Sequence, residues 1–188
     1  SAKYELKIQT VGGIMTLLTQ KDGRVFANLG APIFSPQEIP FTNDSESIEY
    51  TLKVDGQSLL VGALSMGNPH VVLQVSACAT APVETLGPLL EEHPLFPDRV
   101  NAGFMEVISR KEICLRVYER GAGETLACGS GACAAAVHGM RLGLLDDAVT
   151  VQLPGGKLTV SWAGNGNPVW LGGPTATVFE GAIPLRSS

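Results

Sequence analysis

The sequence has few charged and few aromatic residues, and it has no long apolar run. Charged residues make up 16% of the 188 residues and aromatic residues 6%, and 13 Lys and Arg stand against 18 Asp and Glu. The net charge of -5 argues against a nucleic acid or an anionic membrane as partner, because both require a basic face. The longest apolar stretches, such as residues 71–75, are far shorter than the ~20 residues of a membrane-spanning helix.

The opening residues also lack the basic, apolar and small-residue pattern of a secretory signal. A hydrophobic fraction of 45% nevertheless supplies ample material for a packed core. We therefore expect a globular, cytoplasmic protein of enzyme size, with one domain or two small ones.

The chain has four cysteines, Cys78, Cys114, Cys128 and Cys133, but no CxxC pair. The spacing therefore predicts no zinc site and no metal, and a disulfide framework is not expected either. Cys133 lies in an alanine-rich helical stretch, Cys114 in a predicted strand and Cys78 in a turn of small residues. These three are interpreted as small buried hydrophobic residues.

Alternation of apolar and polar residues predicts many short strands. They are expected over residues 4–10, 14–18, 24–29, 47–54, 58–65, 71–75, 102–109, 112–119, 150–153, 158–162, 169–171 and 176–180. Apolar residues at helical spacing predict helices over residues 82–93 and 131–142. Three prolines predict an irregular crossing segment over residues 31–40. The pattern as a whole indicates an α+β fold.

The stretch from residue 119 to residue 136 carries the clearest chemical signal. Cys128 stands directly before a predicted helix, and Gly129 and Gly131 follow it, so that backbone N–H groups can approach an anion closely. The helix N-terminus adds about half a positive charge, which favours a bound carboxylate and should lower the pKa of the Cys128 thiol towards neutrality. Cys128 is therefore predicted to be a reactive base or nucleophile. The alternative, a tight turn that only caps a closely packed helix, stays open.

Other polar residues are weaker candidates when taken alone. His70 lies in a turn, where histidine is more often structural or exposed, and Asn68 and Asn101 lie at strand edges, where asparagine usually serves the turn. Glu119 and Arg120 could equally form a salt bridge at the end of a strand.

Together these segments resemble diaminopimelate epimerase. The resemblance rests on residues 119–125 (ERGAGET), 127–132 (ACGSGA), 67–70 (GNPH), 100–104 (VNAGF), 154–156 (PGG) and 172–174 (GGP). It implies two pseudo-symmetric halves, each a mixed, curled β-sheet or barrel around a central helix. It also implies an epimerase without any cofactor, which interconverts LL- and meso-diaminopimelate for lysine and peptidoglycan synthesis. One cysteine of each half would act: a thiolate removes the α-proton and a thiol returns a proton to the opposite face.

The resemblance also implies roles for individual residues. Cys128 would be one of the two catalytic cysteines, with Glu119 and His70 near the thiols as catalytic partners. The residues expected to bind the substrate are Asn68, Asn101, Glu119, Arg120, Gly129 and Ser130. Backbone N–H groups of Gly129 and Ser130 would stabilise charge on the substrate carboxylate, and an arginine suits the distal carboxylate. The family tends to form homodimers, and Phe179 matches a tyrosine position at that contact.

The sequence departs from the family in one respect. The family's other cysteine lies in a Cys-Gly-Asn-Gly loop of the first half, and no such segment occurs here. We therefore expect residues 30–173 to form the second domain, with residues 1–29 and 174–188 as strands of an incomplete first domain. Such a chain would be inactive alone, because the proton donor for the opposite face is missing, and its uncovered strands would favour association.

Three other readings remain open. The first is a cysteine-dependent racemase of proline or hydroxyproline, although Asn68, Asn101 and Arg120 would then have no distal carboxylate to hold. The second is a phenazine-type isomerase of the same fold, but these isomerases do not depend on a cysteine at position 128. The third is a non-catalytic binding or dimerisation module.

Overall fold

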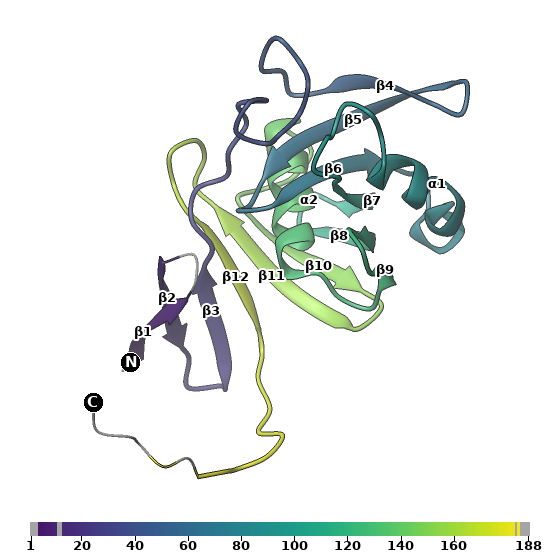
Figure 1. The fold of residues 1–188 in the computed structure, drawn as a ribbon. Helices are drawn as coiled ribbons and strands as arrows, with labels where there is room; N and C mark the ends of the chain where they lie inside the picture. Colours follow the sequence, from purple (N-terminus) through teal and green to yellow (C-terminus); the bar gives the residue numbers. More distant parts are fainter. Residues whose placement is uncertain (1–3, 11–12, 183, 185–188) are drawn as a thin grey trace.

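The computed structural model describes residues 4–10, 13–182 and 184 (Figure 1). The strands are β1 (Tyr4–Thr10), β2 (Gly13–Thr19), β3 (Arg24–Asn28), β4 (Tyr50–Val54), β5 (Gln57–Ser65), β6 (Pro69–Gln74), β7 (Asn101–Ser109), β8 (Glu112–Glu119), β9 (Gly123–Thr125), β10 (Ala148–Leu153), β11 (Gly156–Trp162) and β12 (Val169–Pro174). The helices are the 3-10 helix η1 (Cys78–Thr80), α1 (Val83–Glu91) and α2 (Gly129–Arg141). The predicted α+β fold class is confirmed. Parts of the two expected terminal segments, residues 1–3, 11–12, 183 and 185–188, lie outside the described residues.

All twelve strands belong to one mixed sheet in the order β1-β2-β3-β12-β11-β10-β8-β7-β6-β5-β4, with β9 paired to β8. The pairs β6–β7 and β8–β10 are parallel and the other pairs are antiparallel. The two ends of this path, β1 and β4, do not pair with each other. Within the described part of the chain the sheet is therefore curled but open, and a closed barrel is not formed.

Helix α2 lies in the concavity of the curled sheet (Figure 1) and contacts strands β5 to β8 and β10 to β12. Its residues from Gly131 to Gly139 are all buried. Four alanines within this stretch keep the helix narrow, so the strands can approach it closely. On one side the approach depends on a glycine, because the ring of His138 occupies the space that a Cβ at Gly62 would need. The catalytic candidate Cys128 therefore stands at the end of a rigid, buried element.

Helix α1 covers the other face of the sheet, against β7 and β8. Pro82 occupies its N-cap position, and Gly87 lets the helix lie against the ring of Tyr118. A second apolar cluster fills this side and includes Leu52, Leu90 and Phe104. The sheet is thus covered on both faces in its central part, where the candidate site lies.

Strands β1 to β3 and the end of β12 project away from this body (Figure 1). Several large apolar side chains on them are exposed, among them Tyr4, Leu6, Ile8 and Ile14. The strand predicted over residues 176–180 is wrong: β12 ends at Pro174, and the described residues beyond it form no strand. Val178 and Phe179 are almost fully exposed there, so this segment has no neighbouring strand to pair with. In the described residues, no helix combines the length and apolarity that crossing a membrane requires.

Candidate active site

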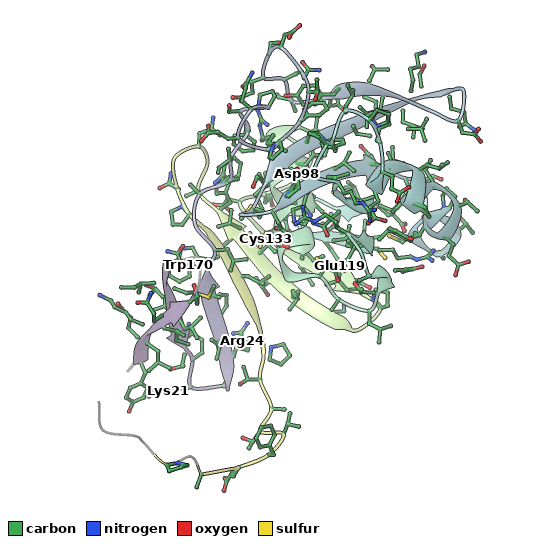
Figure 2. The ribbon with its side chains drawn as sticks, in the orientation of Figure 1. Lys21, Arg24, Asp98, Glu119, Cys133 and Trp170 are labelled. Atoms are coloured by element: carbon green, nitrogen blue, oxygen red, sulfur yellow. The ribbon has the colours of Figure 1, made fainter. Side chains whose placement is uncertain are left out.

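Cys128 occupies the N-cap position of α2, and the β8–β9 hairpin brings two polar residues to its side chain. The Cys128 thiol donates a hydrogen bond to Oε2 of Glu119, the last residue of β8, over 3.0 Å. The other carboxylate oxygen, Oε1, accepts a hydrogen bond of 2.5 Å from the hydroxyl of Thr125 on β9. Figure 2 marks Glu119 at this end of the sheet and Cys133 on the helix. The three residues form a relay in which the thiol proton faces an oriented carboxylate.

The environment of Cys128 corrects one expectation. Burial and the hydrogen bond to Glu119 raise the pKa of the Cys128 thiol to about 11. The backbone N–H of Gly131 and the hydroxyl of Ser130 lower it, as expected for a helix N-terminus, but their effect is smaller. Because the Cys128 residue is only 5% exposed, the loss of hydration of the thiolate outweighs the field of the helix. Cys128 is therefore a thiol at neutral pH, and its proton is directed at the Glu119 carboxylate.

The first turn of α2 offers backbone donors next to this thiol. No side chain caps the helix, and its first internal bond runs from the N–H of Ala132 to the carbonyl of Cys128. This leaves the N–H groups of Gly129 and Ser130 free of intrahelical partners. A Cβ at Gly131 would lie 3.2 Å from the Cys128 sulfur, so a larger residue there would press on the thiol. The turn can thus hold an anion while the sulfur keeps its position.

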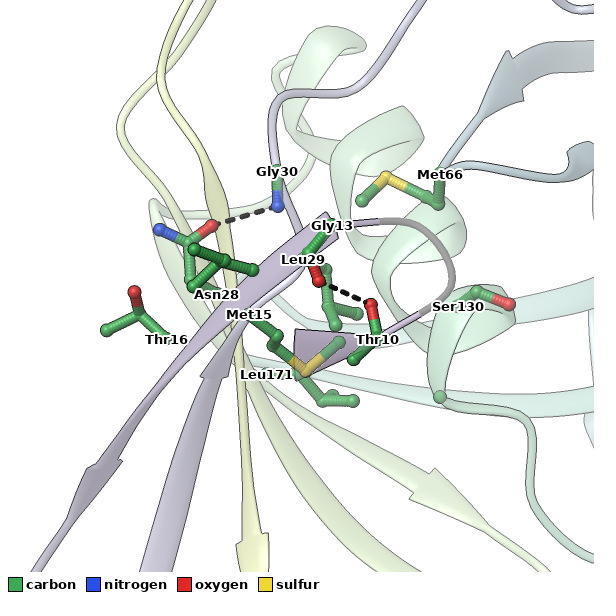
Figure 3. A pocket seen from close by; sticks show the side chains of 12 residues that line it. Thr10, Gly13, Met15, Thr16, Asn28, Leu29, Gly30, Met66, Ser130 and Leu171 are labelled. Atoms are coloured by element: carbon green, nitrogen blue, oxygen red, sulfur yellow. Dashed lines mark hydrogen bonds between the residues drawn. The ribbon is translucent and has the colours of Figure 1, made fainter. Parts of the chain in front are cut away.

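A pocket of about 540 Å³ opens at this helix end (Figure 3). Gly129 and Ser130 line it from α2, and Met66 lines it from the turn after β5. The opposite wall is built by β1, β2, β3 and the residue after β3, and includes Thr10, Gly13, Ile14, Met15, Thr16, Asn28 and Leu29. In the close-up, Asn28 accepts a hydrogen bond from the N–H of Gly30, and Thr10 donates one to the carbonyl of Gly13. The pocket therefore lies between the N-terminal strands and the helix that carries Cys128.

The remaining predicted site residues gather in a second cluster around the starts of β6 and β7. Nε2 of His70 lies 3.0 Å from Oδ1 of Asn68, and His70 pairs with Asn101 across the parallel strands. The amide of Asn101 is used at both ends: it donates to the carbonyl of Pro69 over 2.9 Å and accepts the N–H of Arg120 over 3.0 Å. Asn101 thus fixes the backbone at the end of β8, where Glu119 and Arg120 are adjacent.

His70 is held neutral in this cluster. Burial, together with the charge of Arg120, lowers the pKa of His70 to about 3. Because the oxygen of Asn68 accepts, the ring carries its proton on Nε2. Arg120 itself is exposed, and its Nη1 donates a hydrogen bond to the carbonyl of Asp98 over 2.8 Å. Its remaining donors are available to an anion.

The sequence prediction thus maps onto two groups of residues. Cys128, Glu119 and Ser130 share hydrogen bonds or near contacts, whereas Asn68, His70, Asn101 and Arg120 contact one another. Arg120 follows Glu119 directly and so links the groups. Reasoning from sequence missed Thr125, although a hydroxyl residue three positions before the cysteine is a usable signal. It also missed the pocket wall from β1 to β3, because nothing local marks those strands as facing α2.

Comparison with known proteins adds a decisive observation. The family model described as diaminopimelate epimerase matches residues 62–177, which include both groups of polar residues. The chain belongs to the diaminopimelate epimerase family. The diaminopimelate epimerase of Alkalilimnicola ehrlichii is 54% identical over 185 residues, which are 98% of this chain and 66% of that relative. The chain spans about two thirds of the length of the curated relatives that it matches.

Solved structures show how widely this epimerase fold is shared. A protein from Pseudomonas aeruginosa described as a predicted epimerase matches 93% of this chain and 64% of its own with a TM-score of 0.62 and 18% identity. A probable proline racemase from Agrobacterium radiobacter, solved with bound carbonate, matches 98% of this chain and 61% of its own with a TM-score of 0.67 and 13% identity. At these identities the likeness shows the fold alone. Any argument about which reaction this chain takes part in must therefore rest on the sequence relatives.

Proposed function

We propose that this member of the diaminopimelate epimerase family contributes one of two acid–base cysteines to the epimerisation of LL- and meso-diaminopimelate. The observation that carries the proposal is the Cys128 thiol, hydrogen-bonded to Glu119 over 3.0 Å at the N-terminus of α2. The names of the most similar relatives support the reaction and its place in lysine biosynthesis.

The chemistry requires a base that is stronger than an ordinary buried thiol. In our proposal Glu119 accepts the thiol proton and later releases it to solvent. The Cys128 thiolate removes the α-proton of the substrate and becomes a thiol again, and a second acid protonates the opposite face of the α-carbon. In the reverse direction the Cys128 thiol donates its proton to the α-carbon. Negative charge that develops on the α-carboxylate is stabilised by the N–H groups of Gly129 and Ser130. These donors are preorganised by the helix and need no metal and no cofactor.

Stereochemistry requires a second acid on the opposite face of the α-carbon. Inversion fails if the same group returns the proton to the face from which it came. Cys133 is fully buried in the core, and the Cys78 and Cys114 thiols lie near Glu106 on the outer face of the sheet. We therefore propose that the second acid comes from outside this chain, and that the strands β1 to β3 and the residues after β12 belong to the domain that supplies it. Residues 30–173 are then the second domain, and the chain alone turns over no substrate.

The second cluster suits the distal end of the substrate. Arg120 keeps guanidinium donors that can hold a carboxylate in a bidentate way. We propose that Asn68 and Arg120 contact this end, while Asn101 and His70 position them. Proline and hydroxyproline lack a distal carboxylate, so these contacts favour diaminopimelate. We further propose that the protein acts in the cytoplasm as a homodimer with Phe179, 84% exposed, at the contact.

The proposal is tested by binding and by proton exchange on this chain. Calorimetry with meso-diaminopimelate is expected to show weak binding and none with L-proline, and Arg120→Gln is expected to weaken it at least about fivefold, since a charge-assisted contact contributes ~1.5–3 kcal/mol. Arg110→Gln is the matched control, because Arg110 pairs with Asp146 away from the pocket. Equal affinity for both amino acids would reject the substrate assignment. Turnover of LL-diaminopimelate in deuterated water that is abolished by Cys128→Ala would reject the inactivity of the chain alone.

A further inference from the structure

Three potential metal ligands meet on the face of the sheet that is turned away from α2. Cys78 opens η1, Glu106 lies on β7, and Cys114 is its cross-strand partner on β8. One ligand atom from each residue, the two sulfurs and a carboxylate oxygen, lies within 4.8 Å of the others. Cys78 is buried and the other two residues are half-buried. Sequence spacing could not reveal this group, because its members come from three separate elements.

The group is held by a surrounding layer of hydrogen bonds. The backbone N–H of Cys78 donates to Oε2 of Glu106 over 2.7 Å, and Nη1 of Arg116 donates to the carbonyl of Cys78 over 3.1 Å. Cys78 is therefore fixed on both sides of its Cα. The first bond also orients the Glu106 carboxylate, as hydrogen bonds to metal-binding carboxylates commonly do.

The nearby guanidinium does not oppose a cation here. Arg116 makes a bidentate ion pair with Glu124, with N–O distances of 2.7 and 2.8 Å. Its charge is thus balanced within the protein. Two thiolates and one carboxylate would then present three negative charges to an incoming ion.

The donor set selects the kind of ion. Thiolate sulfur prefers thiophilic metals such as zinc over magnesium or calcium, and zinc accepts a carboxylate beside sulfur ligands. Tetrahedral zinc holds two thiolate sulfurs ~3.8 Å apart, a separation that falls within the 4.8 Å that bounds the distances between the three ligand atoms here. The partial exposure of Glu106 and Cys114 leaves a fourth position for water. Because zinc binds thiolates, uptake of the ion by Cys78 and Cys114 must release their protons.

We propose that Cys78, Glu106 and Cys114 form a binding site for a thiophilic divalent cation of the zinc class. The site joins η1 to strands β7 and β8 and lies apart from Cys128. It is independent of the proposed epimerase chemistry. A bound ion would stabilise the outer face of the sheet, because ions that bind only the folded state raise its stability.

Cobalt(II) is the probe for the test, because its charge-transfer absorption reports thiolate ligands directly. The full chain, reduced with a phosphine rather than a thiol, is titrated with cobalt(II) and then with zinc(II). We expect one equivalent of cobalt to bind with thiolate charge-transfer absorption, and zinc to displace it and raise the melting temperature. Cys114→Ser should remove about half of this absorption, and Glu106→Gln should weaken binding at least about tenfold, since even outer-layer partners of a metal contribute ~10- to 100-fold.

Two controls keep the result specific. Glu112→Gln removes a carboxylate on β8, the strand that carries Cys114. Cys128→Ser removes the thiol of the proposed epimerase site. Both variants should bind cobalt like the unaltered chain. Circular dichroism checks that each variant is folded. Absence of the absorption in the folded chain, or its persistence in Cys78→Ser with Cys114→Ser, would overturn the proposal. The proposal would also be overturned if the free thiols of Cys78 and Cys114 were lost without metal uptake, because the two cysteines would then form an oxidisable pair.

Discussion

Two opposing influences decide the reactivity of Cys128. The N–H of Gly131 and the hydroxyl of Ser130 favour the thiolate, whereas burial and Glu119 favour the thiol and prevail. The stabilisation of the thiolate by the helix N-terminus could be predicted from local sequence, because a cysteine directly before a glycine-rich helix start is recognisable in the sequence. The second could not be predicted, since burial and the approach of β8 are properties of the tertiary fold.

Replacement of Glu119 by glutamine tests this balance. The thiol would lose the carboxylate that opposes its ionisation while burial persists, so its pKa should fall but stay above that of a free cysteine. We expect alkylation of Cys128 by iodoacetamide at neutral pH, followed by mass spectrometry, to accelerate about three- to tenfold, since a shift of one pKa unit changes the thiolate fraction ~10-fold. Glu112→Gln should leave the rate unchanged. A slower or equal rate in Glu119→Gln would show that Glu119 does not restrain the thiol.

Two of the three buried histidines, His70 and His138, make stability depend on pH. Burial is the main cause that lowers the pKa of His70 to about 3 and that of His138 to about 4. In the unfolded chain both titrate near 6.5, so below that pH the unfolded state binds more protons than the folded state. The free energy of unfolding should therefore be constant above about pH 6.5 for these groups and fall as the pH decreases towards 4.

Histidine NMR signals and urea unfolding measure this effect together. The Cε1 protons of His70 and His138 should not titrate in the folded chain between about pH 5 and 8, although histidine signals in urea should titrate near 6.5. For these groups the unfolding free energy should stay constant between about pH 8 and 6.5 and decrease from about pH 6.5 to 5. Titration of both signals near 6.5 in the folded chain would contradict the neutral state assigned to them.

At the scale of elements, period-two alternation predicted nearly every strand and helical spacing predicted both α-helices. Helix α2 begins at Gly129 rather than at residue 131, because the glycines that weaken a helix signal are tolerated here by tertiary packing. Strand β9 was missed, since its three residues, Gly123–Thr125, form a strand only by pairing with β8. The strand predicted over residues 176–180 fails for the converse reason: apolar and polar residues alternate there, but no neighbouring strand pairs with the segment.

The close packing of α2 against β5 requires a glycine at position 62. A Cβ at Gly62 would overlap the ring of His138, and both residues are buried, so the helix would have to shift. We expect Gly62→Ala to lower the unfolding free energy by about 1–3 kcal/mol, as overpacking of a core does. Gly103→Ala is the matched control on β7, because its Cβ would meet only ordinary contacts at 3.4 Å and beyond. Urea unfolding distinguishes the two; equal stability would show that the contact yields easily.

At the scale of the molecule, the family could be predicted from the ordered set of motifs, whereas the arrangement of the first strands could not. Strands β1 to β3 continue the sheet through β12 and form one wall of the pocket at α2. Their side chains are less buried than those of β4 to β8. The pocket beside Gly129 and Ser130 therefore has one wall, α2, that is packed into the core, and a second wall, β1 to β3, whose side chains are mostly exposed or half-buried.

This exposed hairpin should make the chain associate with itself. Tyr4, Leu6 and Ile8 lie on one face of β1 and are 70%, 49% and 43% exposed, and contiguous apolar surface beside an open strand edge favours contact between copies. We expect sedimentation velocity to show masses above the 19.7 kDa of one chain, increasing with concentration. Leu6→Thr with Ile8→Thr keeps the preference for strand but removes apolar surface, and should shift the chain towards a monomer.

The control for this association is Ile108→Thr, because Ile108 on β7 is as exposed as Leu6, at 49%, but lies outside the hairpin. Association that weakens equally in the Leu6→Thr with Ile8→Thr variant and in Ile108→Thr would indicate non-specific hydrophobic association rather than a contact through β1. A chain that remains monomeric at all concentrations would contradict the prediction outright. In that case the apolar face of β1 must be covered within the molecule, and it could not be the face on which the rest of the domain that supplies the second acid packs.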